Sequence, residues 1–334
     1  MHCRILIKEH LSLDWQHSLG VHIVYTPVGM SLLSGVLKDQ ADLFGVIWKL
    51  RSLNLTLLAL EIRETPGQMW PIHEPHAGHL ESPKGMFMMQ QMEQDQPLQG
   101  QRVIILGGTS GIGLATAQLV ASEGASVVVA SSQQSSVDRS LAQLPVGTEG
   151  YAIDLANEGA IKDFFGRIGA FDHLIFTAGE ALLVGELSAI DLEQARQFYN
   201  LRFWGAFMAA KYGSSQIRPG GSIVLTSGAA GRRPSKGLVA VAPITSAVES
   251  LGRALAVELA PIRVNVICPG VIRTDLWNSL PEEAREGFFQ STGKALLVGH
   301  VGDASDVAQS YLYAIRQSYS TGQVIVVDGG AMLV

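Results

Sequence analysis

Three glycines in the stretch VIILGGTSGIG have the spacing of a nucleotide-binding turn. Gly107, Gly111 and Gly113 follow a short run of Val and Ile and precede a helical pattern. Glycine lets the backbone turn tightly and approach a pyrophosphate, and the N-terminus of a helix offers unpaired N–H groups and positive potential. In a chain with 36 glycines this spacing also arises by chance, so the interpretation depends on the flanking strand and helix. Together they predict a dinucleotide site.

The end of the next predicted strand, VVVASSQQSS, indicates which dinucleotide is bound. It lacks the Asp or Glu that would hold a ribose 2′-hydroxyl, and Ser131 and Ser132 stand there instead. Their hydroxyl groups can donate hydrogen bonds to a 2′-phosphate, and Arg139 lies nearby in the sequence. This favours NADP(H) over NAD(H) as the cofactor.

From residue 98 onward, Val- and Ile-rich runs alternate with longer helical patterns. The predicted strands are Arg102–Leu106, Ser126–Ala130, Leu174–Thr177, Ser222–Thr226, Arg263–Ile267 and Gln323–Val327. The predicted helices cover 112–123, 157–168, 191–214 and 241–260. Short buried strands between helices imply right-handed crossovers and a parallel sheet that is covered on both faces. We therefore expect an α/β fold over 98–334, with a single doubly wound Rossmann-type parallel sheet and helices on both faces.

The spacing GxxxGxG resembles the short-chain dehydrogenase/reductase family, and further motifs extend the resemblance over roughly 98–330. These motifs are IDL, FTAGE, the Asn of FYNLRFWGAF, the Ser of IVLTSGAAG, CPGVIRT and VDGG. The resemblance implies that Ser227 and Asn200 are catalytic and that Asp154 holds the adenine amino group. It implies cofactor contacts from Gly107, Thr109, Ser110, Gly111, Ile112, Gly113, Ser131, Ser132, Asp154, Leu155, Ala178, Gly179, Pro269, Gly270, Val271 and Thr274.

Each of the three polar residues also has a structural interpretation. Asp154 can be a surface cap, Ser227 can be a turn residue, and Asn200 can hydrogen-bond a backbone carbonyl from within its helix. These alternatives stay open at the level of the sequence.

The family's Tyr-x-x-x-Lys pair is missing from this chain. Alignment on AVESLGRALAVEL places Val241 and Thr245 at the two positions. In the family, the tyrosine delivers a proton to the carbonyl oxygen, and the lysine lowers the tyrosine's pKa and holds the ribose. Neither Val241 nor Thr245 can do this, and a positioned acid contributes about 10²–10⁴ in rate. Ordinary ketone reduction by that mechanism should be badly impaired.

Three functions are compatible with such a site. The substrate can be an iminium ion, which accepts hydride without a proton donor. Alternatively, a cation of the segment GRRPSKG (Arg232, Arg233 or Lys236) replaces the tyrosine, although these residues also suit a solvated loop. In the third case the chain binds the cofactor without redox chemistry, as a regulator or as a pocket for a rearrangement or cyclisation. We expect an NADP(H)-dependent oxidoreductase for a small apolar carbonyl or imine/iminium substrate, with the non-redox protein as the alternative.

The segment after Thr274 occupies the family's variable substrate lid. Its large apolar residues are Trp277, Leu280, Phe288 and Phe289. They can line an apolar substrate pocket, and they equally suit an amphipathic helix packed on the body.

Residues 1–97 differ in composition from the rest and suggest an irregular extension, poorly ordered or outside the functional unit. His73, His76 and His79 lie in a Pro- and Gly-rich stretch without ligand-type partners, so we expect no metal site. Residues 18–37 carry no formal charge, but Pro27 and several polar residues make them a poor transmembrane helix.

Charge and cysteine content limit the partners and the location. The net charge of −6, without a long basic run, argues against a nucleic-acid surface. Cys3 and Cys268 lie far apart in sequence and indicate no disulfide framework, which favours a cytoplasmic location. We expect a small-molecule substrate, no membrane partner, and a homodimer or homotetramer formed through 191–214 and 241–260, as is usual in the family.

Overall fold

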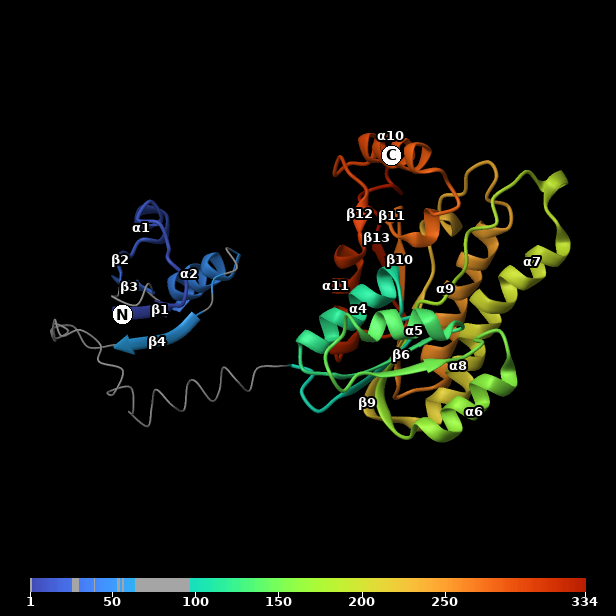
Figure 1. The fold of residues 1–334 in the computed structure, drawn as a ribbon, viewed down its shortest axis with the longest axis horizontal. Helices are drawn as coiled ribbons and strands as arrows, with labels where there is room; N and C mark the ends of the chain where they lie inside the picture. The colour runs from blue at the N-terminus through green and yellow to red at the C-terminus, as the bar shows by residue number, and fades with distance from the viewer. Residues whose placement is uncertain (1, 26–29, 39, 53–54, 56, 64–96) are drawn as a thin grey trace. The chain divides into compact units, whose positions relative to one another are not determined.

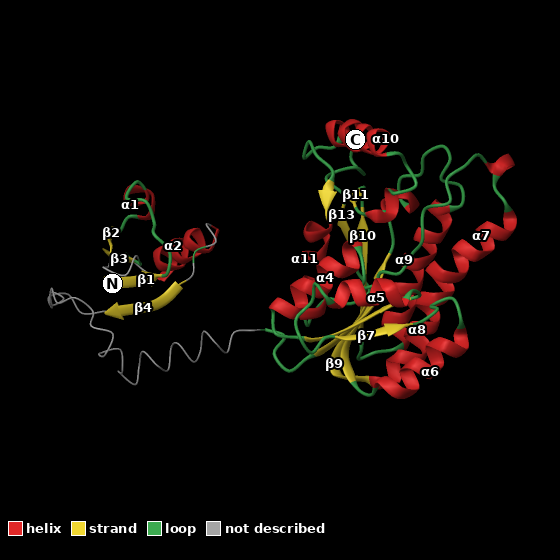
Figure 2. Ribbon diagram, viewed as in Figure 1, coloured by secondary structure: helices red, strands yellow, loops and turns green. Residues whose placement is uncertain are grey.

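The structure is a computed structural model that describes residues 2–25, 30–38, 40–52, 55, 57–63 and 97–334. The chain divides into two compact units, Met1–Asp95 and Gln96–Val334. Each unit has its own sheet and its own core, as Figures 1 and 2 show.

The first unit is a four-stranded antiparallel sheet with two helices on one face. Its elements are β1 His2–Ile7, α1 Trp15–Leu19, β2 His22–Tyr25, β3 Ser31–Val36, α2 Gln40–Ser52 and β4 Leu57–Arg63. The strand order is β2-β3-β1-β4, and the chain order βαββαβ makes this a split βαβ arrangement of the ferredoxin-like type. Alternate residues of β1 (Cys3, Ile5 and Ile7) point into a core that Val46 and Leu50 of α2 complete.

This unit is more regular than the extension that the sequence pattern predicts. The sequence pattern misses it because the helices cover one face of the sheet only, so its strands are not continuous apolar runs: in β2 (HIVY) only Ile23 is buried. Half-buried strands of this kind stand out less than the apolar runs of the second unit. The three clustered histidines, His73, His76 and His79, lie outside the described residues.

The second unit confirms the predicted doubly wound sheet. Its seven parallel strands follow the order β13-β10-β9-β8-β5-β6-β7. The strands are β5 Arg102–Leu106, β6 Ser126–Ser131, β7 Glu149–Ala152, β8 Phe171–Phe176, β9 Ile217–Thr226, β10 Arg263–Pro269 and β13 Val324–Val327. A separate small ladder joins β11 Ile272–Arg273 to β12 Gly302–Asp303.

Helices cover both faces of this sheet (Figure 2). They are α4 Gly111–Ser122, α5 Gln134–Leu141, α6 Glu158–Ile168, α7 Leu192–Tyr199, α8 Ala206–Gly213, α9 Val241–Glu258, α10 Glu282–Ala295 and α11 Ala304–Arg316. In β5, Ile104 and Leu106 pack with the apolar residues of α6, α8 and α9, whereas Val103 and Ile105 pack with those of α4 and α11. The two faces are therefore both apolar, as a buried parallel sheet requires.

The predicted helix 191–214 is interrupted at the position of Asn200. A π-helix, Asn200–Gly205, connects α7 to α8. Such a segment widens the helix by one residue per turn and often lies at a functional site. The interruption cannot be read from the apolar periodicity, which continues through it.

A helix that could span a bilayer is not found in the described part of the chain.

Candidate active site

The predicted site residues follow the carboxyl ends of the parallel strands. From β5 the chain builds the sheet outward through β6 and β7, then returns to β8 on the other side of β5. The loops after β5 and β8 therefore diverge at the topological switch point, where doubly wound sheets bind their ligands.

The glycine loop after β5 is held against the turn after β8. Gly107 has φ 93°, in the left-handed region, and a Cβ there would lie 2.5 Å from the backbone N of Ala178. A Cβ on Gly113 would collide with the carbonyl oxygen of Gly107. Both positions therefore require glycine, because the strand, turn and helix approach too closely for a side chain.

Thr177 joins these two turns and was not identified from the sequence. Its hydroxyl donates to the carbonyl oxygens of Gly107 at 3.1 Å and Leu106 at 3.3 Å. It occupies the second position of the FTAG turn, where the family carries Asn. A polar residue at that position, next to the matching Ala178 and Gly179, is the signal that could have identified it.

The start of α4 offers free polar groups to a ligand. Ser110 is the N-cap residue, but its side chain makes no capping bond, and the first N–H groups of a helix lack intrahelical acceptors. Thr109 precedes Ser110 in the loop, Gly111 and Ile112 open the helix, and Gly111 has φ 49°. A Cβ on Gly111 would lie 3.2 Å from the Thr274 side chain, so the loops after β5 and β10 face each other here.

The ends of β6 and β7 bring Ser131 close to the Asp154 loop. The carbonyl oxygen of Ser131 accepts from Ile153 N at 2.7 Å, and Ser132 is exposed beyond the strand. One carboxylate oxygen of Asp154 accepts from Ala156 N at 2.9 Å within the turn, and the helix cap of α6 is Asn157. Leu155 is buried in the main core, so its side chain faces away from the cleft.

Asn200 hydrogen-bonds the adenine-side loop. Its Nδ2 donates to the carbonyl oxygen of Ala156 at 3.2 Å, so the first residue of the π-helix is linked to the loop after β7. This is the structural alternative that the sequence left open, and it leaves Asn200 a positioning contact in this structure.

Arg202, two residues later, lies against the predicted cofactor turn. Its guanidinium is 4.8 Å from the Phe198 ring centroid, donates to Glu180 O and would be 2.5 Å from a Cβ on Gly179. Its Nε is buried without a hydrogen-bond partner, and burial lowers the pKa of the guanidinium. Arg202 was not identified from the sequence; a charged residue within a predominantly apolar helix was the available signal.

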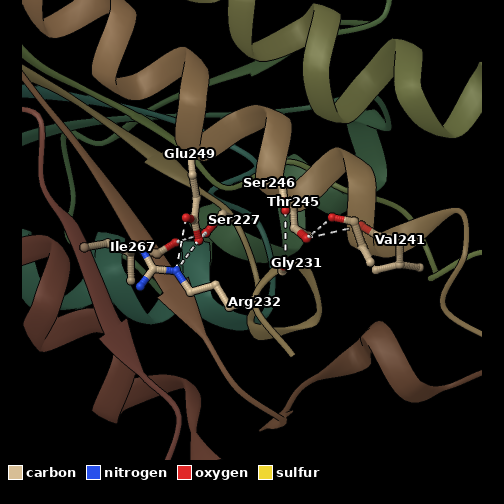
Figure 3. A network of polar contacts seen from close by, with 9 residues as sticks. Ser227, Gly231, Arg232, Val241, Thr245, Ser246, Glu249 and Ile267 are labelled. Atoms are coloured by element: carbon tan, nitrogen blue, oxygen red, sulfur yellow. Dashed lines mark hydrogen bonds and ion pairs between the residues drawn. The ribbon is translucent and has the colours of Figure 1, made fainter. Parts of the chain in front are cut away.

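Ser227 lies beside an ion pair between the buried Glu249 and the partly exposed Arg232 (Figure 3). Its backbone N donates to Ile267 O at 2.8 Å, and its Oγ lies 3.4 Å from Glu249 Oε1 and 3.5 Å from Ile267 O. Arg232 Nε donates to both Glu249 oxygens, at 2.9 and 3.1 Å. Glu249, on α9, is only 6% exposed, and its proximity to Ser227 was not predictable from the sequence.

The positions of the absent tyrosine and lysine are filled by packed side chains. Val241 is 2% exposed and forms an apolar cluster with Phe198 and Ile244. Thr245 Oγ1 donates to the carbonyl oxygen of Ala242 at 2.9 Å or of Val241 at 3.2 Å. Because that hydroxyl proton is used within the helix, neither residue offers a proton to a substrate.

The cations of the GRRPSKG segment have other partners. Arg232 pairs with Glu249, and Arg233 donates to Ala331 O. Lys236 pairs with Glu186 at 2.7 Å and its side chain is 87% exposed, as in a solvated loop.

The loop after β10 is fixed by the last strand. Gly270 N donates to Val327 O at 2.9 Å, and a Cβ on Gly270 would lie 2.8 Å from the Cα of Asp328. Pro269 is the last residue of β10, and Val271 O accepts from Gly302 N at 3.3 Å. The loop thus carries Pro269, Gly270, Val271 and Thr274 to the same edge of the sheet as Ser227.

The lid segment packs mainly on itself. The Trp277 and Phe288 rings are 4.8 Å apart, and Trp277 Nε1 donates to Ile272 O at 3.0 Å. Phe289 is buried, as expected for one face of an amphipathic helix. Arg273 and Glu286 form an ion pair at 2.9 Å that joins the loop to α10.

An open cavity of about 610 Å³ lies between α7 and the start of α9. Its lining includes Leu192, Arg196, Asn200, Trp204, Val239 and Ala240. The part of the chain that the structure describes contains no cluster of three or more residues able to hold a metal ion.

Comparisons with known proteins agree with this architecture. A family model described as an SDR-like Rossmann domain matches 96–334, and one described as a domain of unknown function matches 2–61. The chain is 35% identical over 255 residues to the short-chain dehydrogenase/reductase ucsE of an Acremonium species, with 71% of this chain and 97% of ucsE covered.

Two solved structures are also similar. A small-chain dehydrogenase in complex with NADPH is 41% identical, with a TM-score of 0.63 and coverage of 70% of this chain and 99% of that chain. The MalC reductase/Diels-Alderase from Malbranchea aurantiaca is 30% identical, with a TM-score of 0.67 and coverage of 72% and 98%. By its fold, its ordered motifs and these matches, the chain belongs to the short-chain dehydrogenase/reductase family.

Proposed function

We propose that the chain is an NADP(H)-dependent reductase acting on a small apolar carbonyl or imine/iminium substrate, with a non-standard active site. The observation that carries the proposal is the combination of a glycine-lined switch-point cleft with an apolar cluster where the family places its acid. The first feature suits a dinucleotide, and the second suits a substrate that needs little proton donation.

The residues present fit NADP(H). Gly107 and Gly113 let the loop after β5, the start of α4 and the turn after β8 pack closely, and the start of α4 presents unpaired N–H groups to a pyrophosphate. Ser131 and Ser132 end β6 without an acid, so a 2′-phosphate meets no repelling charge from that strand end. The NADPH complex of a 41% identical dehydrogenase supports the same cofactor.

A bound NADPH supplies hydride, and the chain's own residues then decide which acceptors can react. A ketone that accepts hydride becomes an alkoxide, which needs a proton. A protonated imine or an iminium becomes an amine directly and needs none. Val241 and Thr245 offer no proton and Lys236 is solvated, so the site favours the second class.

The experiment is a direct one. Purified full-length protein is titrated with NADPH and NADH by following cofactor fluorescence, then incubated with matched cyclic imines and ketones while NADPH absorbance is followed. Oxidation of NADPH that depends on the imine supports the proposal. NADPH binding without turnover of either class would favour the alternative function.

That alternative is a cofactor-binding homologue without redox activity, regulatory or acting as a pocket for rearrangement or cyclisation. The name of MalC, a reductase and Diels-Alderase, shows that a similar protein combines reduction with a cyclisation. The cavity beside α7, with its apolar lining residues Leu192, Trp204 and Val239, would be the shaping surface.

We also propose a homodimer or homotetramer in the cytoplasm. Leu192, Trp204 and Phe207 are exposed along α7, the π-helix and α8, and small residues such as Ala254 are exposed on α9. An exposed apolar strip of this kind on two neighbouring helices suits a contact with a second copy. Light scattering that shows only monomer would refute the assembly.

A further inference from the structure

The hydroxyl of Ser227 is surrounded by groups that accept hydrogen bonds. Its Oγ lies 3.4 Å from Glu249 Oε1 and 3.5 Å from Ile267 O. A carbonyl oxygen and a carboxylate can only accept, so the single hydroxyl proton points to one or the other. These distances are long, as hydrogen bonds in a site without its ligand often are.

The ion pair with Arg232 fixes the orientation of the Glu249 carboxylate. Arg232 Nε donates to both carboxylate oxygens, and Glu249 raises the pKa of Arg232 in return. Glu249 is 6% exposed and sits in the middle of α9, so the carboxylate has little freedom to turn away. Arg232 therefore holds the acceptor in place under Ser227.

Cys268, another neighbour of Ser227, also leaves the hydroxyl proton of Ser227 directed away from the cleft. The Cys268 thiol lies beside the hydroxyl, and burial raises the pKa of Cys268 to about 11, so the group stays protonated. The hydroxyl of Ser227 donates toward this sulfur, which is a weak acceptor and so also leaves the hydroxyl proton directed inward. Val241, where the family has the phenol that would also contact Ser227, contributes only methyl groups.

With its proton directed inward, Ser227 can offer only a lone pair to the cleft. A ligand atom that meets it must therefore carry a hydrogen. The nitrogen of a protonated imine does, whereas the oxygen of a ketone does not.

We propose that Glu249, held by Arg232, is a positioning residue that makes Ser227 a hydrogen-bond acceptor, so that the site selects N–H-bearing imine substrates over ketones. This inference rests on the proposed reductase function and names the substrate class of that site.

The test reverses the polarity with an isosteric change. In Glu249→Gln, the amide oxygen accepts from Arg232 Nε and the amide nitrogen donates to Ser227 Oγ, which turns the hydroxyl proton toward the cleft. The probes are 2-methyl-1-pyrroline, protonated at the assay pH, and cyclopentanone, each with NADPH. The readout is the ratio of kcat/KM for the imine to kcat/KM for the ketone.

We expect Glu249→Gln to lower this ratio about fivefold to tenfold, the size of one hydrogen bond. Ser227→Ala removes the acceptor, so adding Glu249→Gln to Ser227→Ala should leave the ratio unchanged. A merely structural role would instead slow both substrates equally. An unchanged imine-to-ketone ratio in a folded, NADPH-binding Glu249→Gln protein overturns the proposal. The proposal also fails if Glu249→Gln lowers the ratio equally in the unmutated protein and in Ser227→Ala.

Two further arms cover the remaining outcomes. If Glu249→Gln fails to fold, Glu249→Asp is used instead. The shorter side chain keeps the ion pair with Arg232 but moves the carboxylate away from Ser227 Oγ. It should lower the imine-to-ketone ratio of kcat/KM, by less than the fall of about fivefold to tenfold expected for Glu249→Gln. If neither probe is turned over, the reductase function fails. Competition of cyclopentylamine and cyclopentanone for the NADPH-loaded protein then shows whether Ser227 accepts or donates a hydrogen bond. Preferential binding of the ammonium form, weakened in Glu249→Gln, supports the acceptor site; equal or absent binding overturns it.

Discussion

Replacing Val241 by tyrosine, the residue that the family carries there, should destabilise this protein rather than restore it. Val241 is 2% exposed and packs with Phe198 and Ile244. Inserting a phenol ring into a filled cluster costs about 1–3 kcal/mol, and a buried phenol hydroxyl without a partner adds about 1–3 kcal/mol. For a unit of this size each kcal/mol lowers Tm by roughly 2–4 °C, so a fall of roughly 4–24 °C is expected in a thermal melt.

A matched control is an exposed valine outside the helices proposed for the homo-oligomer contact. Val146 is 106% exposed, so Val146→Tyr meets no packed neighbours and should change Tm by no more than about 2 °C. If Val241→Tyr is as stable as Val146→Tyr and gains brisk ketone reduction, the apolar cluster has room for the acid and this prediction is wrong. The double change with Thr245→Lys should not improve the protein's own reaction, because Thr245 packs against Gly228 and Gly231 of the loop after Ser227.

The remaining predictions concern the cofactor, pH and the first unit. NADPH should bind more tightly than NADH in fluorescence titration and Ser132→Asp should reverse the order; equal affinities in the unmutated protein would refute this. His173, bonded to Ser222 and Gln101, has its pKa lowered by burial to about 4, below its ordinary 6.5. The unfolded chain therefore binds the proton first, and the free energy of unfolding should fall by up to about 3 kcal/mol from pH 6.5 to pH 4. In urea melts His173→Asn should flatten that slope, and an unchanged slope would contradict the assignment. A protein that begins at Met92 should melt cooperatively and bind NADPH; if it is insoluble while the full chain is not, the first unit is needed for folding.

The sheet of the second unit was predictable because its signal is local and repeated. Runs such as Val103–Leu106 and Val127–Ala130 are continuously apolar, as strands buried on both faces must be, and they lie between helices of ordinary length. The glycine loop was predictable for the same reason, since a Gly required by close backbone approach stands at a fixed distance from its strand.

The partners of the site residues were not predictable, because they come from distant parts of the chain. Glu249 lies 22 residues after Ser227, and only the packing of α9 on β9 and β10 brings the two together. Asn200 reaches Ala156 across 44 residues because the helix widens into a π-helix at that point. Apolar periodicity reports which face of a helix is buried, not which polar atom it meets there.

The most direct test of the central claim compares a matched imine and ketone with the unmutated, full-length protein and NADPH across pH. We expect the protonated imine to be reduced at least about 10²-fold faster than the ketone, because the ketone lacks the proton donor that the family carries at the position of Val241. The imine rate should not depend on an acid of the protein. Brisk ketone reduction with a pH profile that requires a protonated side chain would contradict the account.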